Sequence, residues 1–113
     1  MGKTYKDLKA HLQEFKEFSI NTMTAKINSI KTLNNNKVYY NIYSYNTIIA
    51  VVVIDDKNYT CYLSTAKYSR TTSRQQGYIK QAYDEKHIKE VDVDFFVNNL
   101  HYTKSDFLRS QYS

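Results

Sequence analysis

The pattern of apolar and polar positions centres on residues 47–54, whose sequence TIIAVVVI carries no charge and is rich in Val and Ile. Side chains on both faces of this segment are apolar, which is typical of a strand buried on both sides. A helix is the alternative for a short apolar run, but eight residues is a strand length, and DDKN at 55–58 ends the segment in a turn. We therefore predict a strand in the middle of a sheet, with other parts of the protein over its faces or a dimer partner over one.

An amphipathic helix is predicted ahead of this strand. Apolar residues recur at spacings of three and four, at Tyr5, Leu8, Leu12 and Phe15. Thr4 and Asp7 suit the first turn, because a hydroxyl accepts from a free amide there and a carboxylate is stabilised by the helix dipole. We expect a helix from this cap to about Phe18 that packs on the protein's own sheet. A dimer seam is the less favoured alternative.

Three further segments alternate between apolar and polar residues as strands do: residues 20–33, 38–45 and 59–64. Turn residues separate the strands, with NNNK at 34–37 and DDKN at 55–58. Short turns join neighbouring antiparallel strands, so the four predicted strands form an antiparallel meander.

The C-terminal third is predicted to be mainly helical. Thr72 and Gln75 fit a capping box, and an inward face would follow at Gln76, Ile79, Ala82 and Tyr83. Residues 91–97 alternate like a strand while residues 95–100 also follow helical spacing, so we favour a short extended piece, a helix, and a last turn from Ser105. The prediction is a single α+β domain, residues 1–113, with an N-terminal helix, a four-stranded antiparallel meander, and two or three C-terminal helices packed on the sheet.

Composition adds limits on class and location. A chain of 113 residues can bury a core as one domain, and the single cysteine, Cys61, gives no disulfide framework. We expect neither a signal peptide nor a membrane-spanning segment, and hence a cytoplasmic protein. The net charge of +5 is unevenly distributed, because residues 57–83 contain five bases and no acid whereas residues 84–113 contain six acids and four bases.

Candidate catalytic residues do not form a recognisable group in the sequence. The three histidines are scattered, and Cys61 alternates with apolar neighbours as a core residue does. Asp55 and Asp56 end a buried strand, as magnesium ligands of nucleases do. The following strand, NYTCY at 58–62, supplies neither the further acid nor the lysine that such sites use, so a hairpin turn is favoured. We expect no catalytic residues, metal or cofactor, and a protein that is not an enzyme.

The strongest candidate binding site is a basic cluster at the start of the second predicted helix: Lys67, Arg70, Arg74, Tyr78 and Lys80. Amide groups at a helix start attract anions, and a tyrosine offers a stacking surface, so the cluster suits a nucleic-acid phosphate or a carboxylate-rich protein patch. The alternative is that the nearby Ser and Thr residues cap the helix while the bases stay solvated. A second, weaker candidate is an acidic face at Asp84, Glu85, Glu90 and Asp92, for which a solvated surface is favoured.

Two segments carry a resemblance to a known group of proteins. YNTIIA at 45–50 followed by YSRTTSRQ at 68–75 resembles a two-part pattern of small proteins encoded by bacteriophages and mobile elements, among them anti-CRISPR inhibitors of type II CRISPR effector nucleases. The resemblance implies a phage protein that acts in the cytoplasm of a bacterial host and evades host defence by inhibition. It carries over no catalytic or contacting residue.

The resemblance and the charge together suggest how such an inhibitor would act. Wholesale mimicry of DNA requires a strongly acidic protein, and this chain is net positive, so we expect binding that occupies a surface of the effector nuclease and its guide RNA and blocks DNA cleavage. The alternative is a small basic nucleic-acid-binding accessory or regulatory protein of a mobile element. Either would work as a monomer or a homodimer.

Overall fold

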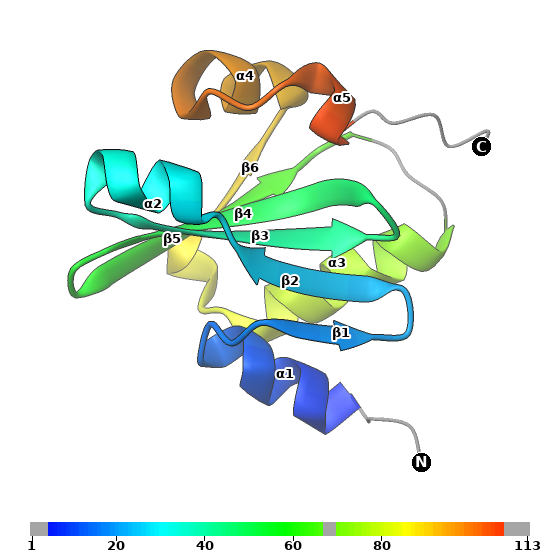
Figure 1. Ribbon diagram of the computed structural model, residues 1–113. Coiled ribbons are helices and arrows are strands. Elements are labelled where there is room, and N and C mark those ends of the chain that lie inside the picture. The colour runs from blue at the N-terminus through cyan, green and yellow to red at the C-terminus, as the bar shows by residue number, and fades with distance from the viewer. Residues whose placement is uncertain (1–4, 67–69, 108–113) are drawn as a thin grey trace.

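The computed structural model describes residues 5–66 and 70–107 (Figure 1). The predicted cap at Thr4 and the predicted binding residue Lys67 lie outside these residues. Along the chain the elements are α1 (Tyr5–Gln13), β1 (Phe18–Ile20), β2 (Met23–Ile27), α2 (Ser29–Asn35), β3 (Val38–Ser44), β4 (Thr47–Asp55), β5 (Asn58–Ser64), α3 (Arg70–Ala82), the 3-10 turn η1 (Glu85–His87), β6 (Ile88–Val91), α4 (Val93–Leu100) and α5 (Lys104–Phe107).

The described strands form one six-stranded mixed sheet with the order β1-β2-β3-β4-β5-β6. The first five strands are antiparallel neighbours, as the meander prediction requires, whereas β5 and β6 are parallel and are connected through α3. The α+β class is therefore confirmed, and the prediction of four strands is corrected to six. The two additional strands are short, which is why sequence alternation did not separate them.

The central strand β4 confirms the prediction of a strand buried on both faces. Ile49, Ala50 and Val52 belong to one core cluster, and Ile48 and Val51 belong to the other. Ile49 and Ala50 share a face because the register with β3 shifts by one residue between Ile42 and Tyr43. A β-bulge of this kind places two consecutive residues opposite one and turns the strand locally.

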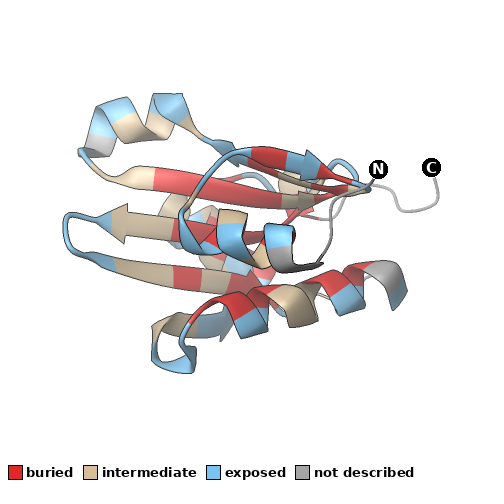
Figure 2. Ribbon diagram, turned by 90° about the horizontal axis from the view of Figure 1, so that it is seen from below, coloured by how far each residue is buried: buried red, intermediate tan, exposed pale blue. Residues whose placement is uncertain are grey.

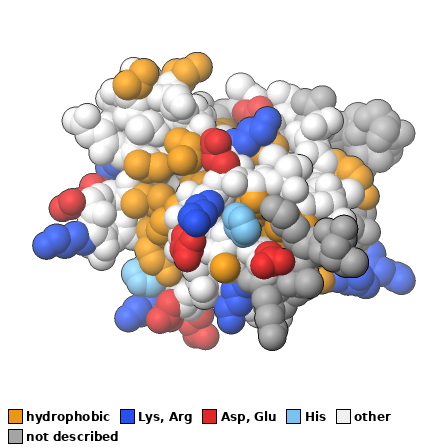
Figure 3. All heavy atoms as spheres, turned by 60° about the horizontal axis from the view of Figure 1, so that its bottom comes forward, with side chains coloured by type: hydrophobic (Ala, Val, Ile, Leu, Met, Phe, Trp, Pro, Cys, Tyr) orange, Lys and Arg blue, Asp and Glu red, His pale blue; other side chains and the backbone are white. Residues whose placement is uncertain are grey.

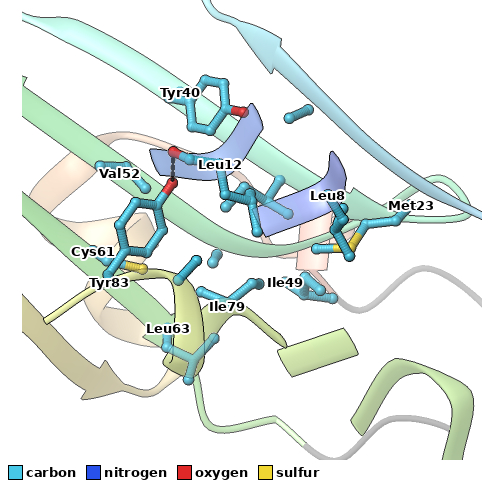
Figure 4. Close-up of a cluster of buried hydrophobic side chains, with 14 of the residues drawn as sticks. Leu8, Leu12, Met23, Tyr40, Ile49, Val52, Cys61, Leu63, Ile79 and Tyr83 are labelled. Carbon is cyan, nitrogen blue, oxygen red and sulfur yellow. Dashed lines mark hydrogen bonds between the residues drawn. The ribbon is translucent and has the colours of Figure 1, made fainter. Parts of the chain in front are cut away.

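Helices cover both faces of the sheet (Figure 1). α1 and α3 lie over one face, while α2, α4 and α5 lie over the other. Seen from below, α3 has its buried residues on the side toward the sheet and its exposed residues on the opposite side (Figure 2). The core under α1 and α3 includes Leu12, Cys61, Ile79 and Tyr83, and the buried Tyr83 hydroxyl donates to the Leu12 carbonyl at 2.7 Å (Figure 4).

The first helix ends at Gln13 rather than near Phe18. Phe15 adopts a left-handed backbone, with φ 55°, and the N–H of Lys16 donates to the carbonyl of His11 at 3.0 Å. These features form a Schellman-type helix end, which usually requires glycine. Aromatic contacts of the Phe15 ring accompany it, with Tyr40, Tyr59 and Tyr83.

Residues 20–33 are not the single strand that loose alternation predicted. A turn at Asn21, with φ 56°, separates β1 from β2, and the helix α2 begins after Asn28. The Asn28 side chain accepts from the N–H of Lys31 at 3.3 Å, which is a typical helix cap. Asn36 then ends α2 in the left-handed conformation, as asparagine is able to do.

The C-terminal segment has the predicted order of a short extended piece and then a helix, but the extended piece is β6 at Ile88–Val91, and residues 93–97, whose alternation suggested a strand, are helical. β6 pairs with β5, and α4 begins immediately afterwards with Asp92 as its cap, the carboxylate accepting from the N–H of Phe95 at 3.0 Å. Phe96 and Phe107 stack with ring centroids 4.2 Å apart and fill the core beneath α4 and α5. A last helical turn, α5, begins at Lys104.

Candidate binding site

The β5–α3–β6 connection creates a candidate site among the described residues. Its two strands are parallel, so their carboxyl ends lie at the same end of the sheet, where α/β folds commonly bind ligands. A depression with a volume of about 320 Å³ lies there between α3 and the strand ends. It is lined by Leu63, Ser64, Thr65, Ala66, Ser73, Gln76, Gly77, Lys80 and Glu90.

Buried polar contacts fix how α3 lies on the sheet. The hydroxyls of Ser44 and Thr72 are 2.9 Å apart, and the Gln75 amide donates to the Thr22 hydroxyl at 2.8 Å. The Gln76 amide donates to the Ser64 carbonyl at 2.9 Å and ties the helix to the end of β5. These three contacts determine which side chains of α3 face outward.

The predicted capping box is wrong in its register. α3 begins at Arg70, so Thr72 and Gln75 lie within the helix and face the sheet as buried residues. Their polar groups are used in packing between α3 and the β1–β3 part of the sheet rather than at the helix end. Gln75 Oε1 is buried and accepts no hydrogen bond from the residues that the structure describes.

The basic residues predicted on this helix are presented in different ways. Arg70 and Arg74 are exposed, and neither forms a salt bridge with any residue that the structure describes. Lys80 pairs with Glu90 across the depression, with 3.3 Å between Nζ and Oε2. Tyr78 is half-buried and packs against the core under α1 and α3. The described part of the cluster therefore presents two unpaired arginines and one paired lysine.

The residues predicted as an acidic face mostly have partners within the protein. Asp84 caps η1 by accepting from the N–H of Lys86, Asp92 caps α4, and Glu90 pairs with Lys80. Glu85 is exposed in the first turn of η1. Capping accounts for two of the four carboxylates without any ligand, and Glu90 belongs to the depression that the basic residues border.

On the face that carries α1 and α3, the described side chains form no field of a single sign. Lysine and arginine side chains alternate with aspartate and glutamate side chains across it (Figure 3). A surface for a long stretch of nucleic acid normally presents clustered positive charge. Interspersed charges are more typical of a protein contact, in which groups of both signs find partners.

The remaining chemically capable residues have structural surroundings. Burial raises the pKa of the Cys61 thiol to about 12, which keeps it in the unreactive thiol form at neutral pH. His87 stacks on Tyr59, with 4.2 Å between ring centroids, and Asp55 and Asp56 are exposed in the β4–β5 hairpin. Within residues 5–66 and 70–107, no group of three His, Cys, Asp or Glu side chains is arranged to hold a metal ion.

Two features of the surface were not found from the sequence. Ile30 and Leu33 project from α2 with 74% and 81% of their surface exposed. Their three-residue spacing and the Asn28 cap were the available signals, but the loose alternation of residues 20–33 favoured a strand. Gly77, which lines the depression, carries no side chain that could mark it as a site residue in the sequence.

In comparisons with known proteins, no family model, no curated protein and no solved structure matches this chain. Among the described residues, none of the helices is long and apolar enough to cross a membrane.

Proposed function

We propose that the protein is a phage or mobile-element inhibitor that binds a type II CRISPR effector nuclease with its guide RNA and blocks DNA cleavage by occupying a surface. In this proposal the exposed face of α3 is the contact surface, and Arg70 and Arg74 are its anchors. Arginine is enriched at the energetic centres of protein interfaces because its planar guanidinium makes several directed hydrogen bonds. The protein itself performs no chemistry.

The observation that carries the proposal is the state of these two arginines. Both are exposed, lie one helical turn apart, and form no salt bridge with a described residue, while the neighbouring Lys80 is already paired. An unpaired arginine on a rigid helix can meet a carboxylate of a partner without first breaking an internal contact. The mixed charge of the surrounding face supports a protein partner (Figure 3).

The resemblance to anti-CRISPR proteins gains support from the positions of its two segments. Residues 45–50 and 68–75 are separated in sequence, yet Ser44, which precedes the first segment, is in contact with Thr72 of the second at 2.9 Å. This contact brings the end of β3 beside the first turns of α3, next to the start of the first segment and within the second. Thr72 and Gln75 in that pattern are packing residues, and Arg70 and Arg74 are the exposed ones.

The test is a binding and cleavage assay with a purified type II effector loaded with guide RNA. We expect the wild-type protein to co-elute with the effector and to suppress cleavage of a linear target DNA. The double variant Arg70→Glu/Arg74→Glu should lose at least tenfold in inhibition. A matched control, Lys26→Glu/Lys57→Glu, makes the same change in net charge at exposed lysines elsewhere and should inhibit normally. If no loaded type II effector binds or is inhibited, the proposal is wrong.

Nucleic-acid binding is the second candidate, and the absence of acids in residues 57–83 favours it. A phosphate-binding surface loses affinity steeply as salt rises, because bound counterions are released. Fluorescence anisotropy with a labelled 20-base oligonucleotide between 50 and 300 mM salt separates the two functions. Tight, steeply salt-dependent binding that is lost in Arg70→Glu/Arg74→Glu would replace the inhibitor proposal with this one.

A further inference from the structure

Gly77 occupies a helix position that the fold does not require to be glycine. It lies in the interior of α3, where glycine is less favourable than alanine because it gives up more backbone freedom. Its φ is not positive, and a Cβ built on it would meet no atom within 4 Å. Neither backbone conformation nor close packing within the described residues therefore accounts for a glycine here.

The surroundings of Gly77 point to contact with another molecule. Gly77 lines the depression together with Ser73 and Lys80, which lie four residues before it and three residues after it on the same side of the helix. A helix without a side chain at this point lets a ligand approach the helix backbone closely. Arg70, one further turn toward the start of α3, borders the same side with an unpaired positive charge.

The lining groups favour a peptide over a nucleotide. They combine donors and acceptors, including the Ser73 and Thr65 hydroxyls and the Lys80–Glu90 ion pair, and peptide groups carry one donor and one acceptor each. None of the described residues that line the depression is aromatic, so these residues offer a base no stacking surface of the kind that single-stranded nucleic acids use.

We propose that this depression binds an extended peptide segment of a protein partner, whose main chain passes over Gly77 and whose acidic side chain pairs with Arg70 or Arg74. The inference deepens the proposed function and rests on it, because it names the part of the partner that α3 contacts. Charge complementarity favours an acidic side chain. Lys80, which lines the depression, is paired with Glu90, whereas Arg70 and Arg74, which lie on α3 outside the lining residues, form no salt bridge with a described residue.

The test uses the full-length protein as bait for a library of random dodecapeptides displayed on filamentous phage. Gly77→Gln fills the depression with a side chain that favours helix, and Ala10→Gln is the matched control at an exposed position of α1. We expect the wild type to enrich peptides that contain Asp or Glu. A synthetic copy of an enriched peptide should bind Gly77→Gln at least tenfold more weakly and Ala10→Gln with unchanged affinity. Circular dichroism of each variant verifies that α3 is intact.

The outcomes separate this inference from the proposed function. Amide resonances of Ser73, Gln76 and Gly77 should shift when the peptide is added, and shifts confined to another face would overturn the inference. It is also wrong if Gly77→Gln enriches the same peptides as the wild type, or if it loses binding to a 20-base oligo(dT) rather than to peptide. Failure of the peptide selection with intact inhibition of the effector leaves the proposed function standing. Peptide binding without inhibition of the effector would show that the type II effector nuclease is not the target, and it would leave the peptide site in place.

Discussion

Cys61 provides the sharpest test of the packing, because it is the single thiol of the chain and has no exposed surface. It pairs with Val52 on one side and Ile88 on the other, and it lies beside Tyr83 in the core under α1 and α3 (Figure 4). Replacing it by alanine removes the ionisable group. The variant also leaves a small cavity, so its stability at neutral pH will be lower than that of the wild type.

The informative quantity is how this stability difference changes with pH. Burial raises the Cys61 pKa from 9.0 to about 12, since the thiolate loses its hydration in the core. The unfolded thiol ionises from about pH 9 while the folded thiol stays protonated, so its contribution to stability is complete below pH 9 and falls as pH rises toward 12. At pH 10 the unfolded state gains roughly tenfold, which is about 1 kcal/mol. The Cys61→Ala variant has no thiol, so its free energy of unfolding does not decrease with pH for this reason.

Urea denaturation followed by circular dichroism at pH 7 and pH 10 measures the effect for both proteins. We expect the stability advantage of the wild type over Cys61→Ala to shrink by about 1 kcal/mol between these pH values. Burial also raises the pKa of Tyr40, Tyr83 and Tyr102 in both proteins, and these contributions cancel in the difference. The smaller part of the Tyr83 shift that comes from Cys61 is lost with the thiol and belongs to the Cys61 effect. Cys61→Val, which restores most of the lost volume, should show the same pH dependence as Cys61→Ala. An advantage that stays constant with pH would refute a buried thiol at this position.

Three further predictions concern stability and can be measured by the same denaturation assay at pH 7. Gly77→Ala should raise the free energy of unfolding by about 0.5 to 1 kcal/mol, because the added methyl meets no atom within 4 Å and alanine favours helix; a loss of stability would contradict the open surroundings of this residue. Tyr102→Phe should lower it by about 1 to 3 kcal/mol, since the buried hydroxyl donates to Asn41 Oδ1 at 2.6 Å and the amide would lose that partner. The double variant Ile30→Ser/Leu33→Ser should change stability by less than about 1 kcal/mol because both side chains are exposed. Loss of effector inhibition in this variant, with Arg70→Glu/Arg74→Glu unaffected, would move the contact surface from α3 to α2.

The parts of the fold that sequence reasoning recovered are those encoded by local patterns. β4 is recognisable because a run of β-branched residues has no competing periodicity, and the structure buries it on both faces. The turns at Asn36 and Asp56 are recognisable because asparagine and aspartate accept left-handed backbone, and both have positive φ. At these two turns the residue type and the backbone conformation agree, and the prediction agrees with the structure.

One kind of error occurs where the backbone adopts a conformation that the residue type does not suggest. Phe15, Tyr45 and His101 also have positive φ, with values of 55°, 59° and 61°. Bulky residues avoid this region unless the surrounding structure compensates for it. At Phe15 the compensation is contact with three tyrosine rings contributed by distant parts of the chain. Those contacts cannot be inferred from the local sequence, so the helix was predicted to extend to about Phe18 although it ends at Gln13.

β6 shows the same limit at the candidate site. Its sequence IKEV is four residues long and exposes Lys89 and Glu90, so nothing local marks it as a strand. It becomes a strand because α3 returns the chain to lie parallel to β5, which is a contact between distant segments. That return also brings Glu90 to Lys80 and closes one side of the depression. The basic residues of α3 could be identified in the sequence. The depression beside them could not, because it depends on the pairing of β5 with β6, which are far apart in the sequence.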